Sequence, residues 1–151
     1  MRNEPQFTIF LENKPGRLLN ISSALAKKRI SIVALTVVDS HEHSVLRFVA
    51  DNAEAAREVL KKLGTPYTES DVIAIELKSQ PGTLATMCEK LSAQHVNIDY
   101  IYCSTSGKNG KTTVFMKATP AEKLRQLFSE APGAKPARLP DRPARRAGAR
   151  R

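Results

Sequence analysis

The residues best suited to chemistry form two Pro-Gly turns, each at the end of a strand-like segment. One lies in residues 11–18 and the other in residues 77–84. Glycine permits a sharp turn and leaves the main chain accessible, while proline presets the start of a helix. Unpaired amides at the positive end of a helix attract a carboxylate. The sequence therefore predicts two anion-binding corners; the competing interpretation is a simple tight turn, capped by Asn13 and Ser79.

The two turns belong to an internal repeat. Shifting the chain by 66 residues places Pro15-Gly16 on Pro81-Gly82 and Ile30-Ser31-Ile32 on Val96-Asn97-Ile98. From residue 46 onward the offset is 68, which implies one two-residue insertion. Insertions are tolerated in loops, so a hairpin turn is expected at residues 39–44 of the first copy and 104–112 of the second. So many matches in order indicate a duplication.

Each copy carries the same alternation of strand and helix patterns. Phe7, Ile9 and Leu11 alternate with polar or exposed positions as in a half-buried strand, and Leu84, Met87, Cys88 and Leu91 have helical spacing. The predicted order is βαββαβ, twice. This order is typical of the ferredoxin-like α+β fold, with both helices on one face of an antiparallel sheet. We expect domains at residues 5–70 and 71–128, with their sheets packed side by side, either as separate sheets or as one continuous sheet.

The end of the chain departs from the repeat. No convincing fourth strand follows Phe128, so the second copy is expected to lack it, although residues 137–139 could pair weakly at a sheet edge. Residues 129–151 hold seven of the 24 Lys and Arg residues, only two acidic residues and four of the nine prolines. A segment with so few apolar groups is predicted to be a disordered basic tail. The net charge of +9 therefore says little about the folded part.

The doubled pattern resembles the ACT domain. A strand ending in Pro-Gly-x-Leu, a helix, and the strand entries Ile30-Ser31-Ile32 and Val96-Asn97-Ile98 carry the resemblance, which covers about residues 5–128. The arrangement is similar to the small stand-alone tandem-ACT proteins of bacteria. The family commonly has Asp at the first position of the turn, where this chain has Asn13 and Ser79. That difference keeps a hydrogen-bonding side chain and removes a charge.

The resemblance implies regulatory binding of a small ligand, usually an amino acid, at interfaces between ACT modules. Main-chain amides near Gly16 and Gly82 would hold its carboxylate, and Asn97 with Asp99 would accept from its ammonium group. Copy two is therefore better equipped than copy one to bind an ammonium group. Local hydrogen bonds at the start of a strand explain Asn97 equally well. The positions that carry over are Asn13, Lys14, Pro15, Gly16, Arg17, Leu18, Ser31 and Ile32 in copy one, and Ser79, Gln80, Pro81, Gly82, Thr83, Leu84, Asn97, Ile98 and Asp99 in copy two.

Other functions find less support in the residues. No Ser/His/Asp or Cys/His set has motif spacing, so we expect no enzyme and no cofactor. His41 and His43 alone do not complete a metal site. Cys88 and Cys103 are expected to be reduced thiols of a cytoplasmic protein, and no apolar run is long enough to span a membrane.

An RNA-binding protein is the alternative on fold, with the basic tail adding phosphate affinity. Base stacking needs aromatic residues on an open sheet face, and only Phe10 and Phe115 are candidates. We therefore expect a regulatory protein that binds an amino acid and acts in trans on a partner enzyme or regulator. A homodimer could cover its edge strands.

Overall fold

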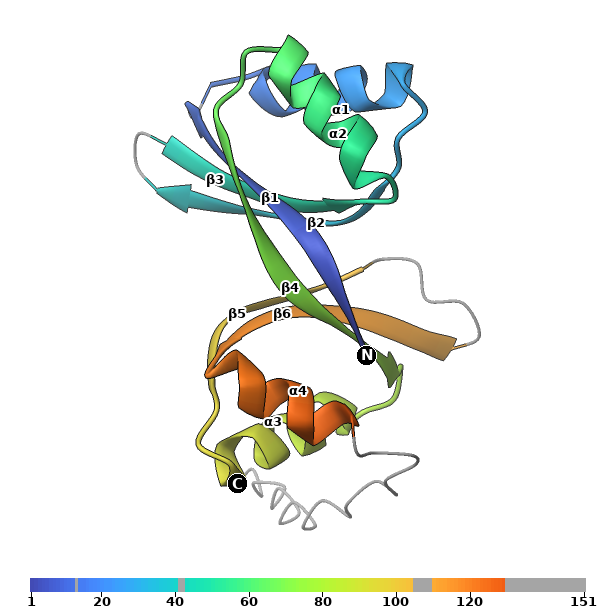
Figure 1. Cartoon of the computed structure of the whole chain (residues 1–151), viewed down its shortest axis with the longest axis vertical. Coiled ribbons are helices and arrows are strands. Elements are labelled where there is room, and N and C mark those ends of the chain that lie inside the picture. The colour runs from blue at the N-terminus through green and yellow to red at the C-terminus, as the bar shows by residue number, and fades with distance from the viewer. Residues whose placement is uncertain (13, 41–42, 105–109, 130–151) are drawn as a thin grey trace, which may run out of the picture.

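The computed structural model describes residues 1–12, 14–40, 43–104 and 110–129. The chain forms two lobes, each with two helices packed on one side of the strands, and the two long central strands are shared between the lobes (Figure 1). The elements are β1 (Arg2–Glu12), α1 (Arg17–Lys27), β2 (Ile32–Ser40), β3 (His43–Ala50), α2 (Ala53–Lys62), β4 (Tyr67–Lys78), α3 (Thr83–Ala93), β5 (Asn97–Cys103), β6 (Lys111–Thr119) and α4 (Ala121–Ser129). The duplicated ferredoxin-like fold is confirmed. Asn13, His41 and residues 130–151 lie outside the described residues, so the expectation of a disordered tail stays a prediction.

The six strands form one antiparallel sheet in the order β2-β3-β1-β4-β6-β5. Its centre is the pairing of β1 with β4, which extends from Arg2 opposite Ala74 to Ile9 opposite Tyr67. The sheets of the two copies therefore lie side by side, as predicted, and the structure shows that they are continuous. Pro5 pairs with Asp71, and these two residues are also separated by the 66-residue repeat. An approximate two-fold axis consequently passes through this pair and relates the lobes.

Both central strands serve both lobes. The first half of β4 is the fourth strand of lobe one, and the predicted boundary between residues 70 and 71 falls within this strand. By the same symmetry, the start of β1 takes the position of a fourth strand in lobe two, because residues 2–4 pair with residues 72–74. The N-terminal end of the chain thus supplies lobe two with the strand that the sequence after Phe128 was not predicted to form. Ser129, which we had placed in the tail, ends α4.

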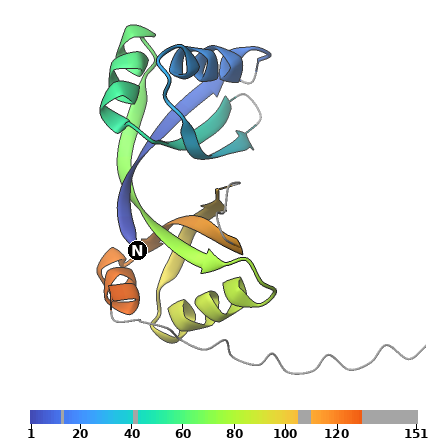
Figure 2. The ribbon, with the colours of Figure 1, turned by 90° about the vertical axis from the view of Figure 1, so that its right-hand side faces the viewer.

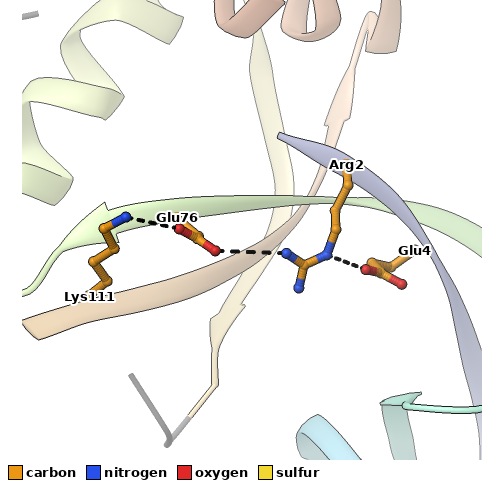
Figure 3. Close-up of polar contacts among 4 residues, drawn as sticks. All are labelled: Arg2, Glu4, Glu76 and Lys111. Atoms are coloured by element: carbon orange, nitrogen blue, oxygen red, sulfur yellow. Dashed lines mark hydrogen bonds and ion pairs between the residues drawn. The ribbon is translucent and has the colours of Figure 1, made fainter. Parts of the chain in front are cut away.

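Charged side chains connect the start of β1 with strands β4 and β6 of lobe two. Arg2 forms an ion pair with Glu4, and its guanidinium also lies 3.9 Å from the Glu76 carboxylate of β4 (Figure 3). The Lys111 ammonium of β6 contacts the same carboxylate at 3.3 Å. These groups are largely exposed, so each contact contributes at most about 1 kcal/mol. Most of the anchoring therefore comes from the main-chain ladder.

The apolar core has three parts. One lies beneath α1 and α2 and contains Phe7, Leu25, Phe48 and Leu60, and its equivalent in lobe two lies beneath α3 and α4. A third lies between the lobes, where the strand faces that the helices leave free meet each other (Figure 2). Its members are Ala34, Val49, Val72, Ala74, Tyr102 and Phe115. The edge strands β2 and β5 are also in contact here, so both faces of the sheet are covered near the centre.

A buried polar group ties the third core together. Gln6 has no exposed surface. Its side-chain amide donates to the Tyr100 hydroxyl at 2.7 Å, and its oxygen accepts from the Tyr102 hydroxyl at 2.9 Å. The Arg47 guanidinium lies 4.6 Å from the centre of the Tyr100 ring. Because its hydrogen bonds are made across the lobes, Gln6 favours this one packing of the lobes.

The start of α2 is capped by a side chain. The N-cap is Asn52, whose side chain accepts from the Ala55 amide at 3.0 Å. The neighbouring Asp51 accepts from the Ser31 amide at 2.9 Å and so joins two loops. No helix in the described ranges is long and apolar enough to cross a membrane.

Removing residues 1–4 should destabilise lobe two, because the main-chain partners of Val72, Ile73 and Ala74 are lost. We expect a lower melting temperature and faster amide hydrogen exchange in β4 and β6. Removing residues 148–151 is the matched control and should change neither measurement. Equal protection of β4 in both deletions would contradict the shared-strand arrangement.

Phe115→Ala should destabilise the protein by about 3–5 kcal/mol, because the ring is fully buried between the lobes. Phe10→Ala is the control, since that ring is 63% exposed and its loss should cost less than about 1 kcal/mol. Urea unfolding followed by circular dichroism measures both. Similar losses in the two variants would argue against the inter-lobe core.

Candidate functional site

The two Pro-Gly corners have the same backbone geometry. We call residues 11–18 corner one and residues 77–84 corner two. Gly16 and Gly82 are the N-cap residues of α1 and α3, with φ of +88° and +87°. L-residues with a side chain rarely adopt this conformation, which explains glycine at both places. The Gly16 carbonyl accepts from the Asn20 amide at 3.0 Å, and the Gly82 carbonyl accepts from the Thr86 amide at 2.9 Å. The duplicated motif therefore folds into duplicated structure.

Both corners present main-chain donors. In the first turn of α3 the Thr83 amide donates to the Gln80 carbonyl at 3.3 Å, and helical bonding resumes at Thr86. Between them, the amides of Leu84 and Ala85 have no hydrogen-bond acceptor among the described residues. The first amides of a helix are orphaned unless a cap or a ligand accepts from them. Corner two thus has two adjacent donors at the positive end of a helix dipole.

The charged side chains at the two corners differ. At corner one the Glu12 carboxylate pairs with Arg17 at 2.5 Å and with Lys14 at 3.1 Å. Hydrogen bonds from Arg17 and Lys14 lower the pKa of the Glu12 carboxyl. The equivalent of Glu12 at corner two is Lys78, which has no anionic partner in the part of the chain that the structure describes. A ligand carboxylate would compete with Glu12 at corner one but would be attracted at corner two.

A hollow of about 290 Å³ lies beside corner two. Between the turn and the edge strand β5, it is lined by Leu77, Lys78, Ser79, Gln80, Pro81, Thr83, Leu84, Cys103, Thr112 and Val114. Five of the predicted positions of copy two, residues 79–81, 83 and 84, therefore line one cavity. The equivalent positions of copy one include Asn13, which is outside the described residues.

The strand-entry residues lie elsewhere in the same lobe. Lys111 pairs with Lys78 beside corner two, whereas Asn97 pairs with Thr119 at the other end of β6. Eight residues of strand separate these ends, or roughly 26 Å. In lobe one, Ser31 and Ile32 are likewise near Ala50 rather than near corner one. The structure does not bring the two halves of either predicted site together within one lobe.

Asn97 and Asp99 make a local group at the start of β5. The Asn97 side-chain amide donates to one oxygen of the Asp99 carboxylate at 3.2 Å, and the Thr119 hydroxyl donates to the other at 3.0 Å. Asp99 is exposed and has no cationic partner in the described ranges. These contacts fit the local interpretation of Asn97, and they leave Asp99 accessible to an ammonium group.

Sequence reasoning missed the side chains of the hollow that come from other strands. Cys103, Thr112 and Val114 approach corner two only because β5 and β6 return to it. Lys78 was the one detectable signal, since it stands where copy one has Glu12. Cys88 and Cys103 are both free thiols. The described residues contain no cluster of three His, Cys, Asp or Glu side chains arranged to hold a metal.

The aromatic residues that RNA bases would need for stacking are mostly buried. Phe115 is fully buried between the lobes, and Tyr102 is only 9% exposed. Phe10 is exposed, but Tyr100 is half-buried beneath Arg47 and bonded to Gln6. Since helices and the opposite lobe cover the sheet, its described part offers no row of exposed aromatic rings for bases.

Comparison with known proteins agrees with this architecture. Residues 3–130 match the family model described as ACT domain pair. No curated protein matches the sequence. Protein BT0572 from Bacteroides thetaiotaomicron is 30% identical with a TM-score of 0.78, over 85% of this chain and 88% of that chain. The regulatory subunit of aspartate kinase from Thermus thermophilus, in its ligand-free form, is 18% identical with a TM-score of 0.61, over 84% and 91%. Its counterpart from Thermus flavus is 19% identical with a TM-score of 0.58 and the same coverage.

The family match extends over almost all of the described residues, and the doubled strand–turn–helix motif lies within it. This chain belongs to the ACT domain pair family.

Proposed function

We propose that the protein is a non-catalytic regulator that binds an amino acid at corner two and acts on a partner protein. The free amides of Leu84 and Ala85 carry this proposal, because they lie at a helix N-terminus beside a hollow of amino-acid size. Lys78 adds a positive charge to the same place. The ligand's carboxylate would accept from the two amides, and its side chain would lie toward Cys103 and Val114.

A second copy of the chain would complete the site. Asp99 is too far from corner two of its own lobe to hold the ammonium group of the same ligand. The edge strand β5 is paired only with β6 in the described structure. If two copies meet around a two-fold axis with their β5 strands antiparallel, the start of one β5 lies beside the end of the other. Asp99 of the second copy would then approach the hollow from the side of Cys103.

The surface around this edge supports such contact. Leu84, which lines the hollow, is 48% exposed, and Ile101 on β5 is 36% exposed. The equivalent residues of lobe one, Leu18 and Leu35, are 40% and 42% exposed. Exposed apolar side chains next to an unpaired strand edge are typical of an interface. Corner two is favoured over corner one because Glu12 already occupies the cations of corner one.

Regulation in trans follows from the proposed site and the similar structures. The Thermus proteins similar in fold are regulatory subunits of aspartate kinase. An amino acid bound between two copies would stabilise the assembly that contacts it on both sides, and so shift the population toward that assembly. A partner that recognises only one assembly would respond to the ligand.

A thermal-shift screen of the twenty amino acids tests the ligand class. A ligand at about 100 times its Kd should stabilise the fold by about 2.7 kcal/mol, which raises the melting temperature by several degrees. Ala85→Pro should weaken this ligand about 10- to 100-fold, because proline removes one donor and is tolerated in the first turn of a helix. Leu19→Pro makes the same change at corner one and should leave the affinity unchanged. No shift with any amino acid would refute the proposal.

The dimer has its own test in Ile101→Arg, which places a charge on the exposed edge of β5. We expect sedimentation equilibrium to show dimers of the unaltered chain and monomers of this variant, with ligand affinity reduced at least tenfold. Leu35→Arg alters the equivalent residue of lobe one and should leave the dimer intact. Dissociation by Leu35→Arg alone would assign the interface to β2 and contradict the proposed site.

A further inference from the structure

A second hollow runs along β4 on the other side of corner two. It consists of two adjoining cavities, of about 210 Å³ and 360 Å³, which share Glu76 and Phe128. Residues 74–78 of β4 form one wall, and the helix side is formed by Thr86, Met87 and Lys90 of α3 with Phe128 of α4. We call this hollow the β4 groove. It begins beside Arg2 and ends at Gln80.

The β4 groove follows a free strand edge. On one side, residues 73–78 of β4 pair with β6. On the other side, the pairing with β1 ends where Arg2 faces Ala74. Residues 75–78 therefore have a strand partner on one side only within the described structure. Unpaired main-chain groups along such an edge are a template for a further strand.

The equivalent edge of lobe one is closed by its own chain. Residues 10–12 of β1 also extend beyond the β4 pairing, and the loop of residues 63–66 lines the cavity beside them. In the described part of lobe two, the end of α4 lies at this place, with Met1 and Arg2 at the start of the groove. Among the described residues, the two lobes thus share one architecture but differ in what lies along this edge.

The charges and the apolar surface of the groove define what it would bind. Lys78 and Lys90 are exposed and have no anionic partner among the described residues. Glu76, the acidic residue of the groove wall, already contacts Lys111 and Arg2 (Figure 3). Leu77, Met87 and Phe128 supply an apolar floor. Complementary chemistry is therefore an extended segment with acidic side chains and at least one apolar side chain.

We propose that the β4 groove is a docking site for an extended acidic segment of a partner protein, which adds a strand to residues 75–78. Four residues of strand cover roughly 13 Å, so the segment would pair over about four residues. Its alternate side chains would face Met87, Phe128 and Lys90 on the helix side of the sheet and Lys78 on the other side, because Leu77 packs toward the helices and Lys78 points the opposite way. The free edge and the unpaired Lys78 and Lys90 carry this inference, and the amides of corner two play no part in it.

Fluorescence anisotropy of a labelled Asp-Val-Glu-Val-Asp peptide with the full chain provides the test. We expect saturable binding that Lys90→Glu and Phe128→Ala each weaken several-fold, whereas Lys61→Glu on α2 leaves it unchanged. The same peptide N-methylated at alternate amides should bind about tenfold more weakly or worse, because it cannot complete the strand ladder. Chemical-shift changes should centre on the amides of residues 74–78.

Three outcomes would overturn the docking site. The first is the absence of saturable binding. The second is equal binding of the N-methylated peptide, which would show attraction by charge without strand addition. The third is binding that survives Lys90→Glu but disappears when Arg145, Arg146, Arg150 and Arg151 are changed to Gln, which would assign it to the tail. The amino-acid thermal shift should be the same in Lys90→Glu as in the unaltered chain, so the two proposals fail independently.

Discussion

The pairing of β1 with β4 is the interaction on which the rest of the structure depends. Each strand is long enough to pass the approximate two-fold axis at Pro5 and Asp71 and to contribute to both lobes. A single four-stranded sheet with a missing edge would expose main-chain groups and part of its core. The start of β4 completes the sheet of lobe one, and the start of β1 completes the sheet of lobe two. Neither lobe is therefore an independent folding unit in the usual sense of a tandem repeat.

The lobes are further joined by a core that has diverged between the copies. Lobe two contributes the large rings of Tyr102 and Phe115, whereas lobe one contributes small side chains such as Ala34. Close packing between large and small groups favours one fit, and the buried Gln6 adds two hydrogen bonds to tyrosines of β5. We infer that the two lobes move as one body. A ligand would then act by changing how separate chains assemble rather than by separating the lobes of one chain.

The two corners have diverged in their side chains while keeping their backbone. The positive φ of Gly16 and Gly82 and the same turn hydrogen bonds persist in both. What differs is the set of charged side chains: corner one has Glu12, Lys14 and Arg17, where corner two has Lys78, Gln80 and Thr83. Local electrostatics of this kind changes which ligand a preformed turn prefers without altering the fold. The proposed function therefore rests on side chains placed around a common main-chain frame.

The repeat, the βαββαβ order and the two glycine turns could be predicted from the amino-acid sequence alone, because they follow from periodicity and from backbone conformations that few residues adopt. It predicted that the second copy lacks its last strand, since nothing after Phe128 has a strand pattern. Only the tertiary structure showed that the start of β1 takes that position, because β-pairing joins residues distant in the chain. For the same reason the distance between Asn97 and corner two, and the approach of Cys103 to Ser79, could not be deduced from a linear motif.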